Sequence, residues 1–171
     1  MKILVLGPVA SGKTTIARDL IKELNLPEFS IDYIVHDDKA NVVRTEEEQR
    51  KMINDIIKQN KEWIIEGMPR THLEVLASAA TTILYLDVEK KELRKRLFFR
   101  IWKNKLGIEK VGYKVDKKLI QRMKDYIEND NKEVLNECMK KYPFKLIILK
   151  NKKEYQSFLS ALKNGEELKY Q

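Results

Sequence analysis

The 171-residue chain has a single cysteine, Cys138, and no long apolar run. One cysteine excludes an intrachain disulfide and any zinc cluster built from several cysteines, and its helical context predicts a small buried side chain. No apolar stretch approaches the roughly 18 residues that a membrane-spanning helix needs. The first predicted strand begins at the N-terminus and leaves no room for a signal peptide, so we expect a cytoplasmic protein in a reducing setting.

Internal repeats, low-complexity segments and interdomain linkers are also missing, and we therefore expect one domain over residues 1–171. Hydrophobic residues make up 43% of the chain, which argues against disorder. The formal net charge of +8 has three explanations: solvated helix faces, the phosphates of a bound nucleotide, or a nucleic-acid surface. No zinc-finger spacing or aromatic RNA-binding motif supports the last of these.

The first fifteen residues carry the most specific motif in the chain. Four consecutive apolar residues, at 3–6, predict a short strand that is buried on both faces. A glycine-rich loop follows, and apolar residues at helical spacing come after it. This is the Walker A pattern G-x-x-x-x-G-K-[ST] in its required context of strand, loop and helix. The loop consists of Gly7, Pro8, Val9, Ala10, Ser11, Gly12, Lys13, Thr14 and Thr15.

The residue types of this loop suit a triphosphate. Gly7 and Gly12 permit backbone angles that a side chain forbids, so that N–H groups can turn inward toward a phosphate. The next helix starts at the same place and directs its positive dipole end at the same anion. Lys13 supplies a positive charge for the β- and γ-phosphates, and the Thr14 hydroxyl is placed to ligate Mg²⁺. We therefore expect ATP and Mg²⁺ as cofactors.

Strand-like and helical segments alternate along the rest of the chain. This alternation predicts a three-layer α/β/α P-loop NTPase fold, whose five-stranded parallel sheet has the order 2-3-1-4-5 and helices on both faces. Helix starts are expected at Thr45, Asp116 and Asn151, and two of these have a glutamate three residues later. The five expected strands are residues 3–6, 29–35, 63–65, 83–86 and 144–149.

Residues 103–114 interrupt the helical pattern. This stretch is polar and basic, contains two glycines and has little helical period. We interpret it as a mobile loop and expect a small lid within residues 103–118.

Two further stretches resemble known kinases. Asp87-Val88, followed by Arg96 and Arg100, resembles the fourth strand of adenylate kinases and the arginine-bearing helix behind it. The stretch Trp63-Ile64-Ile65-Glu66-Gly67-Met68-Pro69-Arg70 resembles the signature of that family. Within this superfamily the chain is most similar to the DNA topology modulation proteins, which are related to adenylate kinase. The order of elements fits from Met1 to about Leu162.

The resemblance implies a role for each of these polar residues. Glu66 takes the place of an aspartate that orders the water shell of Mg²⁺, although it is one methylene longer. Arg70 corresponds to the arginine that grips the acceptor's phosphate, since a guanidinium can bond two oxygens at once. Arg96 and Arg100 correspond to arginines that reach the transferring phosphoryl group, and Arg122 is a further candidate. A solvated side chain is the alternative at each position.

The nature of the acceptor is open at this point. Asp32 is expected near the carboxyl end of the second strand, where an acid can bind a hydroxyl acceptor or take its proton. Asp37 and Asp38 compete for this role, and an acceptor that is already a phosphate needs no base. His36 and His72 lack partners for metal or triad chemistry, and His72 is expected at the surface, at a helix N-terminus.

Three functions follow from these patterns. The first is transfer of the γ-phosphoryl of ATP to a nucleoside monophosphate or a related small acceptor. The second is a kinase that acts on a nucleoside or another hydroxyl acceptor, and the third is a nucleotide-dependent DNA-binding or regulatory protein. No membrane partner is expected, and the guanine-reading pattern N/T-K-x-D is absent from the sequence.

Overall fold

A computed structural model describes residues 1–37, 42–68, 72–107, 116–130 and 132–170. Five parallel strands form one sheet in the order β2-β5-β1-β6-β7, which confirms the predicted order. The five strands are β1 (Lys2–Leu6), β2 (Glu28–Ser30), β5 (Trp63–Glu66), β6 (Thr82–Leu86) and β7 (Leu146–Leu149). A separate antiparallel pair is formed by β3 (His36–Asp37) and β4 (Val42–Val43).

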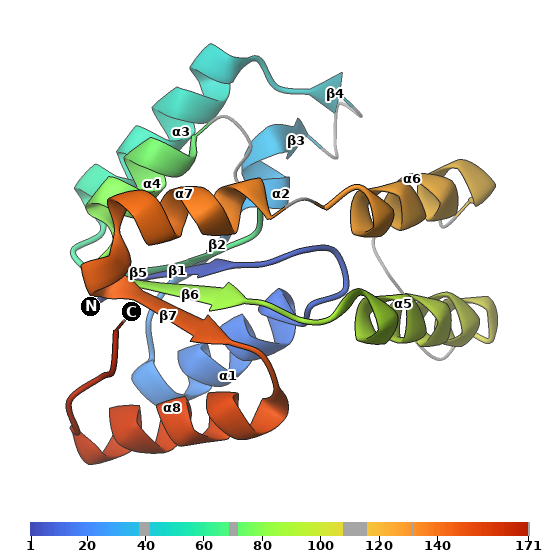
Figure 1. Cartoon of the computed structure of the whole chain (residues 1–171). Helices are drawn as coiled ribbons and strands as arrows, with labels where there is room; N and C mark the ends of the chain where they lie inside the picture. Colours follow the sequence, from blue (N-terminus) through green and yellow to red (C-terminus); the bar gives the residue numbers. More distant parts are fainter. Residues whose placement is uncertain (38–41, 69–71, 108–115, 131, 171) are drawn as a thin grey trace.

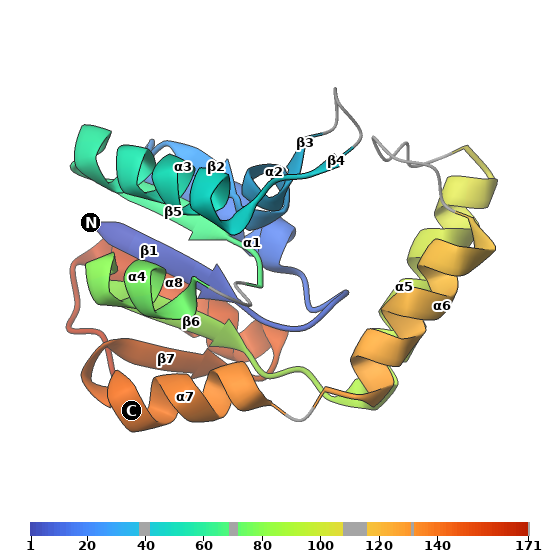
Figure 2. The same ribbon diagram turned by 90° about the horizontal axis from the view of Figure 1, so that it is seen from above.

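Helices cover both faces of the sheet, as predicted (Figure 1). One face carries α1 (Lys13–Leu24) and α8 (Lys152–Asn164), and the other carries α3 (Glu46–Gln59), α4 (Leu73–Ala79) and α7 (Glu133–Lys141). Outside these layers, beyond the carboxyl ends of the strands, α5 (Lys90–Lys105) and α6 (Lys117–Glu128) lie side by side (Figure 2). None of the helices in the described part of the chain combines the length and apolar composition that crossing a bilayer requires.

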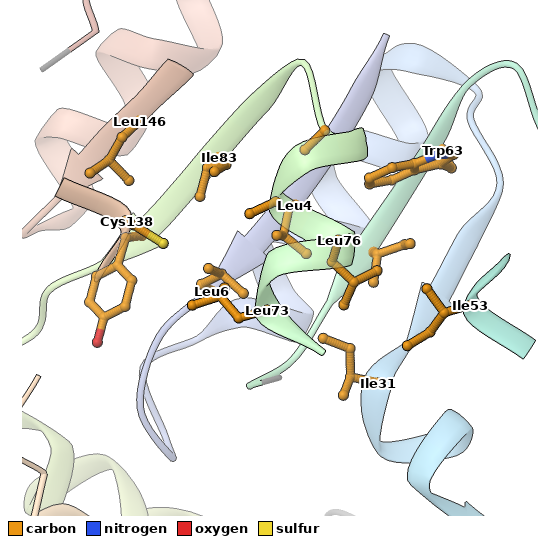
Figure 3. Packing of buried hydrophobic residues seen from close by; sticks show 14 of the residues in the cluster. Leu4, Leu6, Ile31, Ile53, Trp63, Leu73, Leu76, Ile83, Cys138 and Leu146 are labelled. Atoms are coloured by element: carbon orange, nitrogen blue, oxygen red, sulfur yellow. The ribbon is translucent and has the colours of Figure 1, made fainter. Parts of the chain in front are cut away.

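Each central strand contributes to two cores because its side chains alternate between the faces of the sheet. Leu4 and Leu6 of β1 pack with Trp63 on the side of α3, α4 and α7 (Figure 3). Ile3 and Val5 pack against the side of α1 and α8. These four side chains of β1 are fully buried, which confirms the strand predicted at residues 3–6. Cys138 is a free, buried thiol of the first core, as predicted, and burial raises its pKa to about 11.

Two predicted strands are shorter than expected. β2 ends at Ser30, and residues Ile31–Val35 form the short helix α2. Ile31 and Ile34 both point into the same core, which their spacing of three allows in a helix but not in a strand. β7 begins only at Leu146, because Pro143 opens a 3₁₀ turn, η1 (Pro143–Lys145).

The predicted helix starts are confirmed. Thr45 and Glu48 form a reciprocal capping box, while Asp116 and Asn151 each accept a backbone N–H bond in the first turn of α6 and α8. α5 runs to Lys105, so the first residues of the segment predicted as a lid are helical; half of that segment, residues 108–115, lies outside the described residues, and the lid stays a prediction. Beyond α8, Leu168 of the C-terminal tail packs against the core on the side of α1 and α8.

Gly67 brings the end of β5 into contact with the start of α2. Its φ is +141°, and a Cβ at this position would lie 2.6 Å from the Cβ of Ile31. Ile31 is the first residue of α2 and immediately precedes Asp32. The absence of a side chain at Gly67 therefore sets how closely Asp32 can approach the end of β5.

We expect Gly67→Ala to lower the free energy of unfolding by about 2–4 kcal/mol, since it adds both a strained φ and a steric clash. Gly165→Ala is the matched control, because Gly165 has a φ of +65° but nothing within 4 Å of its virtual Cβ. The control should cost only about 1 kcal/mol in urea unfolding. Equal losses for the two variants would contradict the contact with Ile31.

Candidate active site

The loop between β1 and α1 reverses the chain through three residues with positive φ. These are Gly7 at 150°, Ala10 at 63° and Gly12 at 103°. A Cβ on Gly7 would lie 2.8 Å from Ser11 Oγ and 2.9 Å from Leu86 Cβ, so packing as well as backbone angle requires glycine here. No acidic residue occupies the first turn of α1. The positive end of this helix therefore favours an anion in the loop.

Lys13 folds back over the loop. Its Nζ donates a hydrogen bond of 2.9 Å to the carbonyl oxygen of Pro8. Burial lowers the pKa of Lys13, while the nearby charges of Glu66 and Asp32 raise it and that of Arg100 lowers it. Three other predicted site residues thus act electrostatically on the ammonium group of Lys13, although the roles of all four stay predictions.

Glu66 lies between the loop and the edge strand. The parallel register pairs Glu66 with Val5 on one side and with Ser30 on the other. Its side chain is buried, and Thr14 Oγ1 donates a 3.4 Å hydrogen bond to Glu66 Oε2. Burial raises the pKa of Glu66, and a hydrogen bond with Ser30 and the charge of Lys13 partly offset this effect.

The pair of oxygens on Thr14 and Glu66 fits a magnesium ion that takes its other ligands from phosphates and water. Within the described ranges, no group of three or more His, Cys, Asp or Glu side chains could hold a metal by itself. The two side chains would therefore hold Mg²⁺ only together with a bound nucleotide.

Arg96 contacts the loop from α5. Its Nη1 donates a 2.7 Å hydrogen bond to the carbonyl oxygen of Ser11, and its Nε donates to Glu92 Oε1 at 2.9 Å. Nearby, Leu93 and Leu97 of the same helix pack with Val9 and Ala10 of the loop. The resemblance implies contact between Arg96 and the moving phosphoryl group, whereas here its guanidinium supports the backbone of the loop.

The other predicted arginines are in different situations. Arg100 lies near enough to Lys13 for its charge to affect the pKa of that group. Arg122 is exposed on α6. Arg70 falls outside the described residues, so its predicted grip on the acceptor stays a prediction.

The three candidate acids, Asp32, Asp37 and Asp38, differ in their surroundings. Asp32 lies in the first turn of α2, just past the carboxyl end of β2, although the strand predicted to run through it ends at Ser30. Asp37 forms an ion pair of 3.1 Å with Arg44, whose guanidinium also donates to the carbonyls of Tyr33 and His36. Asp37 thus helps to hold the end of α2. Asp38 lies outside the described residues.

The expectation that His72 is a surface residue is wrong. It stands at the N-terminus of α4, as predicted, but its side chain is buried, and neither ring nitrogen has a hydrogen-bond partner within the described ranges. Burial and the charge of Arg50 lower its pKa.

A cavity of about 560 Å³ opens beside Glu66 along the edge strand β2. Sequence analysis missed most of its walls, since the helical spacing of Met52 and Ile56 is equally typical of a stripe that faces the core. The alternation of Glu28, Phe29 and Ser30 on an edge strand was the available signal. The lining residues are Thr14, Arg18, Glu28, Phe29, Ser30, Tyr33, Ile34, Met52, Ile56 and Glu66.

We expect Arg96→Ala to weaken ATP binding about three- to tenfold, because the loop loses a charge-assisted bond that is partly exposed. Arg94→Ala is the matched control: Arg94 lies on the same helix and pairs with Glu128 through two bonds of 2.6 Å. Isothermal titration calorimetry should show little change for this control. Equal weakening by both variants would mean that only the charge of α5 matters.

Comparison with protein-family models and with curated proteins finds no match. Solved structures do match, over nearly the whole chain. A shikimate kinase from Bacteroides thetaiotaomicron is 17% identical with a TM-score of 0.60, and the match covers 96% of this chain and 97% of that one. A shikimate kinase from Aquifex aeolicus is 15% identical with a TM-score of 0.53, covering 96% and 98%. A gluconokinase from Sinorhizobium meliloti is 13% identical with a TM-score of 0.52, covering 96% and 94%.

Identities this low bear on the fold and not on the reaction. The finer resemblance to DNA topology modulation proteins receives no support from these structures and stays a prediction. The chain has the three-layer α/β/α fold of P-loop kinases, with the Walker A loop joining β1 to α1.

Proposed function

We propose that the protein is an ATP- and Mg²⁺-dependent kinase that transfers the γ-phosphoryl group of ATP to a hydroxyl group of a small molecule. The observation that carries this proposal is that the charges of Asp32 and Glu66 both act on Lys13 of the phosphate loop, while Glu66 and Thr14 also line the neighbouring cavity. The structural neighbours are named for shikimate and gluconate, which are hydroxyl-bearing small molecules.

The donor side uses the loop and its flanking residues. The loop amides and the N-terminus of α1 bind the triphosphate, and Lys13 exchanges its bond to Pro8 for phosphate oxygens. Thr14 and Glu66 would hold Mg²⁺ together with the nucleotide, and the ion would supply positive charge that neutralises the triphosphate. Arg100 adds positive charge near Lys13, where negative charge spreads over oxygens in the transition state.

The acceptor side uses Asp32 and the cavity. A carboxylate at this position accepts the proton of the acceptor hydroxyl while the acceptor oxygen bonds to the γ-phosphorus. The bond between the γ-phosphorus and the bridging oxygen breaks, and ADP leaves. Among the described residues that line the cavity, Glu28 and Glu66 are acidic and Arg18 alone is basic, so this wall offers a phosphate acceptor only one cationic partner.

Transfer to a nucleoside monophosphate is the second candidate. Arg18 on the cavity wall favours it, as does the role that the adenylate kinase resemblance gives to Arg70. In that reaction the acceptor is already a phosphate, and Asp32 has no proton to take.

Two substitutions separate these reactions. If the acceptor is a hydroxyl, Asp32→Asn should lower kcat about 10²–10⁴-fold, whereas Arg70→Ala should have little effect. The measurement is ADP release from ATP against a panel of nucleosides, sugars and nucleoside monophosphates, with Lys13→Ala as the inactive control. The opposite pair of results would favour a monophosphate acceptor. No turnover with any acceptor, together with ATP binding that Lys13→Ala leaves unchanged, would reject a kinase.

Glu66→Gln tests the proposed magnesium ligand through both stability and binding. Burial raises the pKa of Glu66 above its ordinary value of 4.5, so the unfolded chain loses this proton at lower pH than the folded chain. The stability of the native protein therefore falls as pH rises from 4.5 through the folded pKa, and the cost persists above it.

Glu66→Gln should consequently raise the free energy of unfolding at about pH 8, with a gain that shrinks toward about pH 4. The same variant should weaken ATP binding in the presence of Mg²⁺ more than in its absence. Glu167→Gln, at an exposed position outside the helices and strands, serves as the control and should change neither quantity. A constant gain at every pH would contradict a titrating Glu66.

A further inference from the structure

The positive charge of the chain is concentrated on the two helices that stand outside its layers. Together α5 and α6 contain twelve of the 34 Lys and Arg residues but only three of the 26 Asp and Glu residues. The remaining residues, with 22 basic and 23 acidic side chains, are close to neutral. The net charge of +8 therefore belongs to this helix pair, which we name the basic arm.

The basic arm also exposes large apolar side chains. Phe98, Phe99, Trp102 and Leu106 are 65%, 46%, 51% and 54% exposed. Phe98, Trp102 and Leu106 recur every four residues and therefore form a stripe along α5. The rings of Phe98 and Phe99 contact edge to face, with centroids 5.9 Å apart. We name these four residues the outer apolar face.

The outer apolar face points away from the candidate active site. The inner side of α5 carries Leu93, Leu97 and Ile101, which pack with α6 and with the phosphate loop. At 3.6 residues per turn, a residue five positions farther along the helix lies roughly 140° around it. Phe98 and Trp102 stand in this relation to Leu93 and Leu97. Contacts between the inner side of α5 and a bound nucleotide would therefore leave the outer apolar face exposed to solvent.

We propose that the basic arm docks on an anionic lipid surface, with the outer apolar face inserted at the level of the headgroups. Phenylalanine, tryptophan and leucine flanked by lysine and arginine are the residues that bind a helix to a bilayer interface. Each basic residue near such a surface adds attraction to anionic lipids. The arm extends beyond the three layers, so α5 can lie on a flat surface (Figure 2).

Other occupants fit these observations less well. A second copy of the chain would bring two strongly positive arms together, and like charges repel. A single-stranded nucleic acid would suit the charge and the rings, but it stacks its bases along positively charged grooves. The outer face is an exposed side of a helix and includes the aliphatic Leu106, which provides no ring for stacking.

The two tryptophans provide an internal probe for this proposal. Trp63 is fully buried, whereas Trp102 belongs to the outer apolar face. The full chain is mixed with phosphatidylcholine vesicles that contain about 30% phosphatidylglycerol or none, and binding is measured by co-sedimentation. We expect binding to the anionic vesicles only, a blue shift of Trp102 emission, and quenching by brominated acyl chains. Trp63 supplies the unquenched remainder.

Phe98→Ser combined with Phe99→Ser should weaken vesicle binding at least about tenfold, while Trp102 remains as the reporter. Phe144→Ser is the matched control, because Phe144 is 69% exposed on η1, outside the basic arm. This control should bind vesicles normally. Both proteins should retain ATP binding, which shows that they are folded.

Several results would overturn the proposal. One is the absence of sedimentation with anionic vesicles, and another is equal binding to neutral vesicles. A third is binding of a single-stranded oligonucleotide that quenches Trp102 without a blue shift and is lost in the Phe98 and Phe99 variant. A blue shift of Trp102 with ATP alone would mean that the outer face closes onto the protein itself.

Discussion

The junction between β1 and α1 is the constraint on which the candidate site depends. Gly7 lies against Leu86 of the neighbouring strand, so the loop has no room to relax into an ordinary turn. The helix behind it directs its positive end into the loop, and Lys13 adds a charge that is only partly compensated there. The loop therefore concentrates positive potential in a confined space, and a polyphosphate is the kind of ligand that compensates it.

The remaining polar residues are placed by sheet register. Because β5 pairs with both β1 and β2, Glu66 ends up beside the loop on one side and beside Ser30 on the other. Burial away from water makes the charged form of this carboxyl group costly, which is the main reason for its raised pKa. Asp32 reaches the same region because Gly67 lets α2 approach closely. The positions of Glu66 and Asp32 therefore depend on the strand order and on the glycine at position 67.

The sequence was sufficient for the features that depend on local patterns. The Walker A loop and the caps at Thr45, Asp116 and Asn151 follow from neighbouring residues, and the sheet order follows from the P-loop fold that this loop and the alternation of strands and helices indicate. Helix α2 was missed because five apolar and polar residues after a strand suit either structure, and only packing decides. The cavity and the bond from Arg96 to the loop join elements far apart in the chain, which single-sequence patterns do not reveal.

The bond between Arg96 and Ser11 has a thermodynamic consequence. It connects a projecting helix directly to the backbone that surrounds the phosphates. Binding of a partner that shifts α5 therefore changes the affinity of the loop for a nucleotide. By thermodynamic linkage, the nucleotide changes the affinity of α5 for that partner by the same factor. The guanidinium of Arg96 thus couples nucleotide binding in the phosphate loop to the position of α5 through one direct hydrogen bond.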